Sequence, residues 1–268
     1  MGVKADRLTL RRSRPTAIAM NTPYRLAILI PACNEALRIG ELIEALAAAR
    51  TNPAIEYALT ALVLNGTTDQ TGAVARQLAE RHGLPLEIWE APIKGKAAAL
   101  AWAFPRAAAD QSLDGILFLD ADNATDPNQL AAFDLRDRSA IWIGSRRAPG
   151  AQVIELAGHS PLRSLMSWGM RRITGLLLGL PERDTQCGFK LFPRRHAWLW
   201  ERLVDRSWVF DTELLARAHL AGISVREAPV RWVEKDGSKV NPISDSLRSL
   251  AALWRIRRTL REERTRAA

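Results

Sequence analysis

The chain has 268 residues, of which 47% are hydrophobic and 25% charged, and this ordinary globular composition excludes a fibrous or largely disordered protein. Its formal net charge of +9 predicts an affinity for polyanions such as nucleic acid, anionic lipid headgroups or phosphorylated substrates. The two cysteines, Cys33 and Cys187, are too few for a disulfide framework, which favours a reducing cytosol.

The N-terminal segment is polar, basic and aperiodic, and it predicts a flexible basic tail over residues 1–23. It lacks the apolar core of a signal peptide. No apolar run along the chain reaches the ~18–20 residues that a spanning helix needs. The sequence therefore predicts a chain that does not cross a membrane, although it can lie on the surface of one.

From residue 26 onward, short apolar runs alternate with stretches of helical periodicity. The expected strands cover 26–31, 58–64, 86–89, 115–119 and 140–144, and the expected helices cover 35–50, 70–82, 96–109 and a segment that begins at Pro127. This alternation predicts βαβ units and a mostly parallel central sheet flanked by helices, as in α/β proteins.

The second half of the chain has longer helical segments. Residues 162–180 and 243–261 predict two basic amphipathic helices, residues 211–221 predict a further helix, and residues 224–233 predict a strand. Residues 184–192 change from polar to apolar without a clear period. We expect one domain with two halves, over 24–148 and 149–262.

Polar side chains follow the expected strands, and in a parallel sheet ligands bind beyond the carboxyl ends of the strands. The residues in these positions are Asn34, Glu35, Asn65, Asp69, Asp120, Asp122, Ser145 and Arg146.

Asp120 and Asp122 lie two residues apart directly after the strand at 115–119, so in extended geometry they share one side. Two carboxylates on one side of a cleft predict a site for Mg²⁺ or Mn²⁺, which would bridge a diphosphate and stabilise it as a leaving group. The alternative is that they cap the next helix. For Asp126, which directly precedes Pro127, capping is the favoured interpretation.

Three basic residues are candidate phosphate ligands. Lys96 follows Gly95 at the start of a helix, where a cation and backbone N–H groups together meet phosphates, and its alternative is a solvated surface lysine. Arg146 follows a buried strand, where an unpaired arginine is unfavourable, so it binds either a phosphate or a structural carboxylate partner. Arg163 lies on the first amphipathic helix. If two phosphorylated substrates meet here, we expect Lys96 at the first, and Arg146 and Arg163 at the phosphate of the second.

Several motifs resemble those of family 2 glycosyltransferases. Residues 30–39 (IPACNEALRI) resemble the family's first-strand motif, Gly95-Lys96 its donor-binding helix start, and residues 120–125 (DADNAT) its metal motif. Residues 184–192 (DTQCGFKLF), 208–215 (WVFDTELL) and 230–239 (VRWVEKDGSK) resemble the branch that contains the dolichyl-phosphate β-glucosyltransferases. The likeness extends over roughly residues 25–258.

The resemblance implies a nucleotide-sugar transferase of the GT-A fold type that inverts the anomeric carbon of a UDP- or GDP-hexose. It implies that 24–148 binds the nucleotide sugar and that 149–262 binds the acceptor. It places Pro31, Asn34 and Glu35 at the nucleotide, with Asn65 and Lys96 also on the donor side, and Asp120 and Asp122 at the metal and the diphosphate. The residues that it implies for catalysis are Asp184, Gln186 and Asp122.

The chain departs from the family after the second strand, where two acidic residues usually stand and this chain has Leu64 and Asn65. An aspartate accepts a hydrogen bond from the uracil imide. Leu64 cannot do so, whereas Asn65 can through its amide oxygen.

The favoured function is transfer of a hexose, glucose or mannose, to a polyprenyl phosphate. A phosphate monoester is largely ionised at neutral pH and needs no strong base, since its second pKa is about 6. The first alternative is transfer to a hydroxyl of a soluble metabolite or glycan, which requires Asp184 or Asp211 as a base. A nucleic-acid-binding protein is disfavoured because the basic clusters match no nucleic-acid motif, and a catalytically inactive sugar-binding protein is disfavoured by the intact Asp120 and Asp122.

The two basic amphipathic helices predict peripheral attachment to the cytoplasmic face of a membrane. Their apolar surfaces consist of Leu162, Leu165, Met166, Trp168, Met170, Ile173 and Leu177 on the first helix and Leu247, Leu250, Leu253, Trp254 and Ile256 on the second. The alternative is that both faces pack against the core of the domain itself.

Overall fold

The computed structural model describes residues 22–155, 161–206, 209–235 and 242–267. In the helix that begins at Pro161 the side chains are described from residue 169 onward, and in the helix that begins at Pro242 from residue 248 onward. Its main sheet has the strand order β3-β2-β1-β4-β7-β5-β8. The strands are β1 (Tyr24–Ala32), β2 (Ile55–Leu64), β3 (Glu87–Glu90), β4 (Gly115–Leu119), β5 (Ile141–Ser145), β7 (Phe189–Pro193) and β8 (Val225–Pro229). Only β7 runs antiparallel to its neighbours, so the expected mostly parallel α/β sheet is confirmed.

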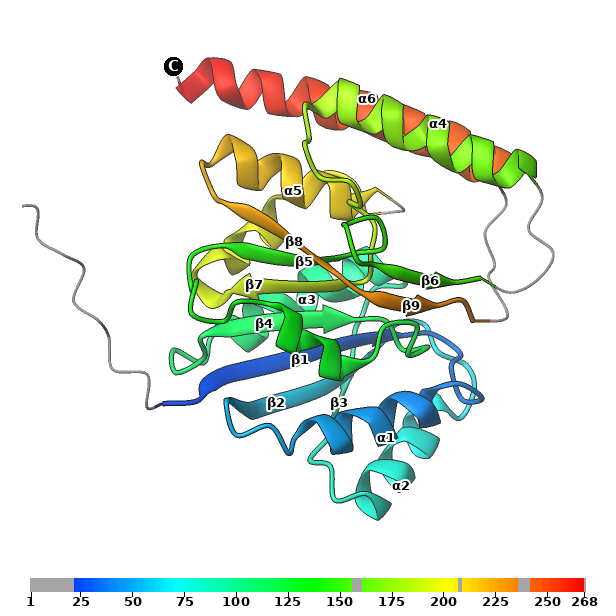
Figure 1. Cartoon of the computed structure of the whole chain (residues 1–268), viewed down its shortest axis with the longest axis vertical. Helices are drawn as coiled ribbons and strands as arrows, with labels where there is room; N and C mark the ends of the chain where they lie inside the picture. The colour runs from blue at the N-terminus through cyan, green and yellow to red at the C-terminus, as the bar shows by residue number, and fades with distance from the viewer. Residues whose placement is uncertain (1–21, 156–160, 207–208, 236–241, 268) are drawn as a thin grey trace, which may run out of the picture.

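Helices cover both faces of this sheet (Figure 1). Helices α1 (Ile39–Ala49) and α2 (Thr71–Arg81) pack on one face, and α3 (Lys96–Ala108) and α5 (Phe210–Leu220) pack on the other. Strand β1 is apolar at nearly every position because it is buried on both sides, as is typical of a parallel strand.

The sheet changes its direction of growth beside β1. The chain adds β2 and then β3 on one side of β1, and it returns to the other side with β4. In open α/β sheets a crevice forms beyond the carboxyl ends of the strands at such a point, and ligands bind there. The loops after β1 and β4 therefore meet where the sequence predicts the site.

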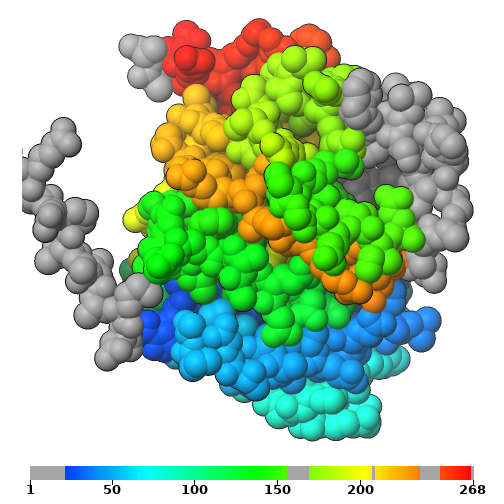
Figure 2. Space-filling view, viewed as in Figure 1, coloured from blue at the N-terminus to red at the C-terminus, as the bar shows by residue number. Residues whose placement is uncertain are grey.

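Helices α4 (Pro161–Leu178) and α6 (Pro242–Ala267) lie side by side in a further layer beyond α5 (Figure 1). The space-filling view shows α4 and the red end of α6 at the top of the molecule (Figure 2). Leu253 and Ile256 of α6 are fully buried, in a cluster that includes Val209 and is packed against Leu177 of α4. Placing Leu253 and Ile256 on the membrane surface was therefore wrong, because the periodicity of a helix does not reveal that a second helix covers its face.

The apolar faces of α4 and α6 are only partly covered. Leu176 of α4 is 83% exposed and Trp254 of α6 is 60% exposed, and Ile173 is also exposed. The predicted surface residues 162–168 and Leu247 lie outside the described side chains. Among the described residues, no helix is long and apolar enough to cross a membrane.

Three expected elements differ in detail. The strand expected over 224–233 divides into β8 and β9 (Arg231–Val233), and β9 pairs with β6 (Gln152–Ile154) in a second sheet. The segment that begins at Pro127 is a short 3₁₀ helix, η1 (Pro127–Ala132), and Asp126 caps it as expected by accepting a hydrogen bond from the Asn128 amide at 2.7 Å. Strand β7 and the 3₁₀ helix η2 (Arg194–Arg202) were not predicted.

The two halves of the chain share one sheet. Strand β7 comes from the second half and lies between β4 and β5 of the first half, and β5 pairs with β8. A division at residue 148 therefore concerns the proposed roles of the halves and not separate folding units. The basic tail predicted over 1–23 lies almost entirely outside the described residues.

Candidate functional site

The loops after β1 and β2 are joined by the side chains of Asn34 and Asp69. Asn34 has a positive φ of 58°, and its Oδ1 accepts hydrogen bonds from the amides of Thr68 at 2.8 Å and Asp69 at 3.3 Å. Asp69 in turn accepts hydrogen bonds from the amides of Ala36 at 3.2 Å and Thr71 at 2.9 Å. The carboxyl ends of the parallel strands form one edge of the sheet, called the edge below, and these two loops form a fixed wall on one side of it.

Pro31 and Glu35 stand at the base of this wall. Pro31 is buried at the end of β1. The Glu35 amide donates to Thr71 Oγ1 at 2.8 Å, and the Glu35 carboxylate accepts hydrogen bonds from the guanidinium of Arg38, each at 2.8 Å. Glu35 therefore orients Arg38, and contact of Pro31, Asn34 and Glu35 with a nucleotide stays a prediction.

Asn65 uses both ends of its amide inside the protein. Its Nδ2 donates to the Ala32 carbonyl at 2.9 Å, its Oδ1 accepts from the Gly95 amide at 3.2 Å, and the residue is buried. The side chain thus links the end of β1 to the start of α3. The oxygen that we expected to meet the base already has this partner, and a contact of Asn65 with the donor stays a prediction.

Asp120 and Asp122 lie at the carboxyl end of β4, at the centre of the edge. The Asp120 amide donates to the Gly188 carbonyl at 3.2 Å, and Asp122 Oδ1 accepts from the Ala124 amide at 3.1 Å. Burial and the neighbouring charge of Asp120 raise the pKa of the Asp122 carboxyl. The two carboxylates therefore form a negative pair whose repulsion a cation would relieve.

The chemistry around this pair fits a divalent ion. A Cβ at Gly188 would lie 2.0 Å from Asp120 Oδ2, so the absence of a side chain there leaves the room that this carboxylate occupies. Among the described residues no group of three or more acidic, histidine or cysteine side chains could hold a metal. Two carboxylates, with the remaining positions filled by phosphate oxygens and water, are the arrangement that Mg²⁺ adopts in many nucleotide sites.

Lys96 enters the site from the first turn of α3. Its Nζ lies 2.5 Å from Asp120 Oδ1, and its side chain is 36% exposed. Burial lowers the pKa of Lys96, but the charges of Asp120 and Asp211 outweigh it and raise that pKa, so the ammonium stays charged. Lys96 is therefore a cation at the predicted diphosphate position, and the alternative of a solvated surface lysine does not describe it.

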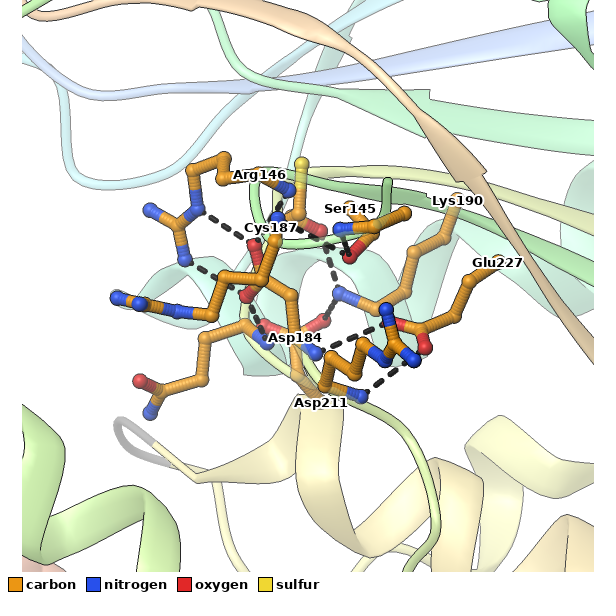
Figure 3. A network of polar contacts seen from close by, with 11 residues as sticks. Ser145, Arg146, Asp184, Cys187, Lys190, Asp211 and Glu227 are labelled. Carbon is orange, nitrogen blue, oxygen red and sulfur yellow. Dashed lines mark hydrogen bonds and ion pairs between the residues drawn. The ribbon is translucent and has the colours of Figure 1, made fainter. Parts of the chain in front are cut away.

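Arg146 and Asp184 bind each other (Figure 3). Asp184 accepts hydrogen bonds from Arg146 Nε at 2.7 Å, from Nη2 at 2.8 Å and from the Arg146 amide at 3.0 Å. Asp184 is 2% exposed, and its amide donates to Glu227 at 3.0 Å. The structural ion pair, which the sequence left as the alternative for Arg146, is thus present.

This ion pair determines the protonation of Asp184. Burial alone would raise the pKa of the carboxyl, but the hydrogen bonds and charge of Arg146 lower it to about 2. A carboxylate that holds its proton so weakly is a poor general base at neutral pH. Direct contact of Asp184 with the transferred sugar stays a prediction.

Gln186 and Cys187 follow Asp184 in the chain. Gln186 is exposed, and its amide donates to Asp184 Oδ1 at 3.3 Å. Cys187 is buried, and burial raises the pKa of its thiol to about 11, which supports a packed residue and not a nucleophile. The side chain of Arg163 lies outside the described residues.

A second buried ion pair, Lys190 with Asp211, was missed by the sequence analysis. Lys190 Nζ lies 2.7 Å from Asp211 Oδ1, and the exposed fractions of the two side chains are 0% and 5%. The available signal was a lysine inside the apolar run Phe189–Pro193, which marks a buried charge in need of a partner. Asp211, expected as a possible base, is therefore held by a lysine.

Arg147 and Arg171 bring further positive charge to the Arg146 side of the edge. Arg147 is exposed directly after Arg146. Burial and the like charges of Arg147 and Arg146 lower the pKa of Arg171, which places this α4 residue near both of them. The edge thus has an acidic side at Asp120 and Asp122 and a basic side at these arginines.

Comparison with known proteins gives a consistent set of relatives. The model of a family described as glycosyl transferase family 2 matches residues 27–198. The chain is 33% identical over 251 residues to a dolichyl-phosphate β-glucosyltransferase of Drosophila melanogaster, covering 85% of this chain and 74% of that protein. It is 31% identical over 262 residues to the dolichyl-phosphate β-glucosyltransferase of Homo sapiens, with 88% and 79% covered.

Solved structures share the fold at low sequence identity. Glucosyl-3-phosphoglycerate synthase of Mycobacterium tuberculosis superposes with a TM-score of 0.56 at 18% identity, covering 87% of this chain and 80% of that one. The same synthase in complex with Mn²⁺, UDP-glucose and phosphoglyceric acid gives a TM-score of 0.57 at 17% identity, with the same shares covered. At these identities the likeness establishes the GT-A type of fold.

Proposed function

Because this chain belongs to glycosyl transferase family 2, we propose that it transfers glucose from a nucleoside diphosphate glucose to the phosphate of a polyprenyl phosphate. The relatives named as dolichyl-phosphate β-glucosyltransferases support glucose as the sugar and a polyprenyl phosphate as the acceptor. The choice between a UDP and a GDP donor is part of the proposal, and we favour UDP-glucose.

The observation that carries the choice of acceptor is the state of the two candidate bases. Asp184 is bound by Arg146 and its pKa is about 2, and Asp211 is bound by the fully buried Lys190. Transfer to a hydroxyl needs a base that takes up a proton. A phosphate monoester arrives with its nucleophilic oxygen already ionised, since its second pKa is about 6. The pairing of both carboxylates therefore favours phosphate over hydroxyl.

In the proposed reaction an oxygen of the acceptor phosphate attacks the anomeric carbon of the sugar. The new carbon–oxygen bond forms as the bond to the diphosphate breaks, its electron pair leaves with the nucleoside diphosphate, and the configuration inverts. No proton has to be removed from the acceptor. The tasks left to the protein are orientation of the two substrates and stabilisation of the charge that develops on the diphosphate.

We assign the donor to the acidic side of the edge. Asp120 and Asp122 would hold Mg²⁺ or Mn²⁺, which when bound neutralises the leaving diphosphate. Lys96 stands next to Asp120 and supplies a further positive charge to the same phosphates. Pro31, Asn34, Glu35 and Asn65 would form the wall against the nucleotide.

We assign the acceptor phosphate to the basic side. Arg146 is fixed by Asp184, while Arg147 and Arg171 surround it with positive charge. Arg163 is proposed to join them from the first turn of α4. Two negative substrates would then meet between the lysine of the donor side and the arginines of the acceptor side.

The acceptor is a lipid, so the protein has to work at a membrane surface. The exposed Leu176 and Trp254 come from adjacent helices and are accompanied by exposed arginines, among them Arg172 and Arg255. Apolar area and basic charge together favour peripheral binding to an anionic membrane. We propose attachment to the cytoplasmic face through the layer formed by α4 and α6.

The test is a transfer assay with purified protein. UDP-glucose, GDP-glucose and GDP-mannose are each incubated with Mg²⁺ or Mn²⁺ and a short-chain polyprenyl phosphate in detergent, and glucosyl phosphoryl polyprenol is measured. We expect product from UDP-glucose, and none after the metal is removed with EDTA. Efficient transfer to soluble glycans or phosphoglycerate, with none to the lipid phosphate, would overturn the proposal.

A further inference from the structure

Lys190 is a lysine enclosed within the sheet. On β7 it pairs with Phe118 of β4 and with Ile143 of β5, and its side chain is fully buried. An ammonium group is strongly disfavoured in such a place unless partners replace its water. Besides Asp211, Lys190 Nζ donates to the Cys187 carbonyl at 2.5 Å, and it lies 5.4 Å from the centre of the Phe118 ring. Lys190 thus places a charge where an apolar side chain would pack with a smaller desolvation penalty.

The carbonyl that Lys190 holds belongs to a segment in contact with the proposed donor site. Gly188 follows Cys187, and its carbonyl accepts the hydrogen bond from the Asp120 amide. Gly188 also lies directly against the Asp120 carboxylate, since a Cβ there would come within 2.0 Å of Oδ2. A shift of the peptide between Cys187 and Gly188 would therefore move Asp120.

The start of α5, which carries the Lys190 partner Asp211, also borders Lys96 on the other side of Asp120. Lys96 Nζ contacts Asp120 Oδ1 and lies 5.5 Å from the centre of the Phe118 ring. Lys96 Nζ also lies 5.8 Å from the centre of the ring of Phe210, which precedes Asp211 in the chain. The start of α5 thus lies close to the lysine that contacts the Asp120 carboxylate. Figure 3 shows Lys190 reaching from the sheet to both Cys187 and Asp211.

We propose that Lys190 and Asp211 are positioning residues, whose buried ion pair holds the Cys187–Gly188 peptide against Asp120 and thereby fixes the carboxylate that binds the donor. The inference rests on the proposed donor site at Asp120 and goes beyond it. Neither residue needs to touch the substrate. Their effect reaches the site through the Cys187 carbonyl and the Gly188 carbonyl that follows it.

A purely stabilising role is the competing explanation, and a double substitution separates the two. Replacing both members of a buried ion pair with apolar residues of similar size often leaves stability unchanged or improved. Lys190→Met/Asp211→Leu is therefore expected to fold with a melting temperature close to that of the wild type. If the pair positions Asp120, the KM for the nucleotide sugar should still rise about tenfold, the size of effect seen when groups that orient a ligand are lost.

The matched control is the other buried ion pair of α5. Arg217 Nε lies 2.8 Å from Glu213 Oε1, and their side chains are 3% and 0% exposed. This pair bonds the Val204 and Asp205 amides, and it has no contact with the Asp184–Gly188 segment among the described hydrogen bonds. Arg217→Met/Glu213→Gln is expected to change stability without raising the KM for the nucleotide sugar.

A second readout requires neither metal nor substrate. Amide hydrogen exchange at Asp120 should become about tenfold faster in Lys190→Met/Asp211→Leu, since its acceptor Gly188 is no longer held, while amides of α1 keep their wild-type rates. Unchanged exchange at Asp120, or recovery of both stability and KM in the double variant, would overturn the inference. If the double variant does not fold, Asp211→Asn, which keeps the size of the residue and removes its charge, is measured in the same two ways.

Failure of the proposed function gives a different pattern. If the wild type transfers no sugar to a polyprenyl phosphate, the acceptor proposal falls. Exchange at Asp120 and binding of UDP-glucose, measured by calorimetry, still report whether Lys190 and Asp211 position the donor site.

Discussion

Two aspartates at the same edge of the sheet have opposite environments. Asp122 lies beside another carboxylate, and burial together with that charge raises its pKa. Asp184 lies against the guanidinium of Arg146, which lowers its pKa to about 2 even though burial opposes this. The charge of Asp122 is left to be neutralised by something that binds, whereas the charge of Asp184 is neutralised within the fold.

This difference separates groups that act on ligands from groups that shape the site. Asp120 and Asp122 face one close cation, Lys96, so the negative charge that remains on the pair is unfavourable for folding and favourable for binding a further cation. A buried ion pair with three hydrogen bonds between its partners holds a loop in place and has little capacity left for proton transfer. Substitutions at Asp122 should therefore act mainly on activity, and substitutions at Asp184 mainly on stability.

The largest effect is expected at the acidic pair of Asp120 and Asp122. Asp122→Asn should lower turnover by about 10²–10³-fold, because the charge that would hold the metal against the diphosphate is lost. The melting temperature should not fall, since repulsion from Asp120 is relieved. Steady-state kinetics and thermal unfolding check the two parts. The control is Asp126→Asn, where asparagine can still cap η1, and this variant should keep its turnover. An active Asp122→Asn enzyme would contradict the assignment.

The reverse pattern is expected at the neutralised pair. Asp184→Asn leaves Arg146 without its counter-charge in a largely buried place and should lower the free energy of unfolding by about 3 kcal/mol. Urea unfolding followed by tryptophan fluorescence measures this loss. Arg146→Ala should destabilise at least as much, because it leaves the more deeply buried Asp184 carboxylate without its cation. Equal stability of Asp184→Asn and the wild type would show that the pair does not hold the fold.

Acid should reveal the same ion pair through pH dependence. The pKa of Asp184 is about 2 in the folded protein, whereas its ordinary value, taken for the unfolded chain, is 3.8. The unfolded chain therefore binds the proton more readily. The resulting stabilisation is complete above pH ~4 and disappears as the pH falls through ~2, with a size of about 2 kcal/mol. Unfolding measured from pH 5 to pH 2 should therefore depend less steeply on pH in Asp184→Asn than in the wild type, and identical slopes would refute the pKa assignment.

The smallest effect concerns exposed apolar residues, which should differ according to whether they lie on the α4–α6 layer or elsewhere on the surface. Leu176→Ser should weaken sedimentation with anionic vesicles about tenfold, the equivalent of one leucine removed from an apolar contact. Leu37→Ser is the control, since Leu37 is fully exposed on the loop before α1, and α1 lies at the opposite end of the molecule from the α4–α6 layer (Figure 1). If Leu37→Ser and Leu176→Ser behave alike, the layer is not the membrane surface.

The sequence predicted the parts of the site that depend on residues close together in the chain. Alternating strands and helices place Asn34 and Asp120 after strands, and a parallel sheet brings such positions together. Asp126 was correctly expected to cap a helix, because capping involves only neighbouring residues. The assignments of individual residues to nucleotide, sugar and acceptor stay predictions.

The sequence could not predict which distant charges pair. Lys190 and Asp211 are 21 residues apart, and their contact depends on the antiparallel insertion of β7 between β4 and β5. The side-chain amide of Asn65 likewise bonds two backbone groups that lie 33 and 30 residues away in the chain. For α4 and α6, periodicity revealed apolar faces, but only the packing of the two helices decided which residues are covered.

The acceptor has to arrive ionised if neither candidate base is available: Asp184 holds a proton too weakly, with a pKa of about 2, and Asp211 is paired with the buried Lys190. The most direct measurement compares a short polyprenyl phosphate with the polyprenol of the same chain length, using UDP-glucose and Mn²⁺ at pH 7.5. The two acceptors share the lipid and differ only in the phosphate. We expect glucose transfer to the phosphate and none above background to the alcohol. Transfer to the alcohol at a comparable rate would mean that a working base is present, and it would contradict the account.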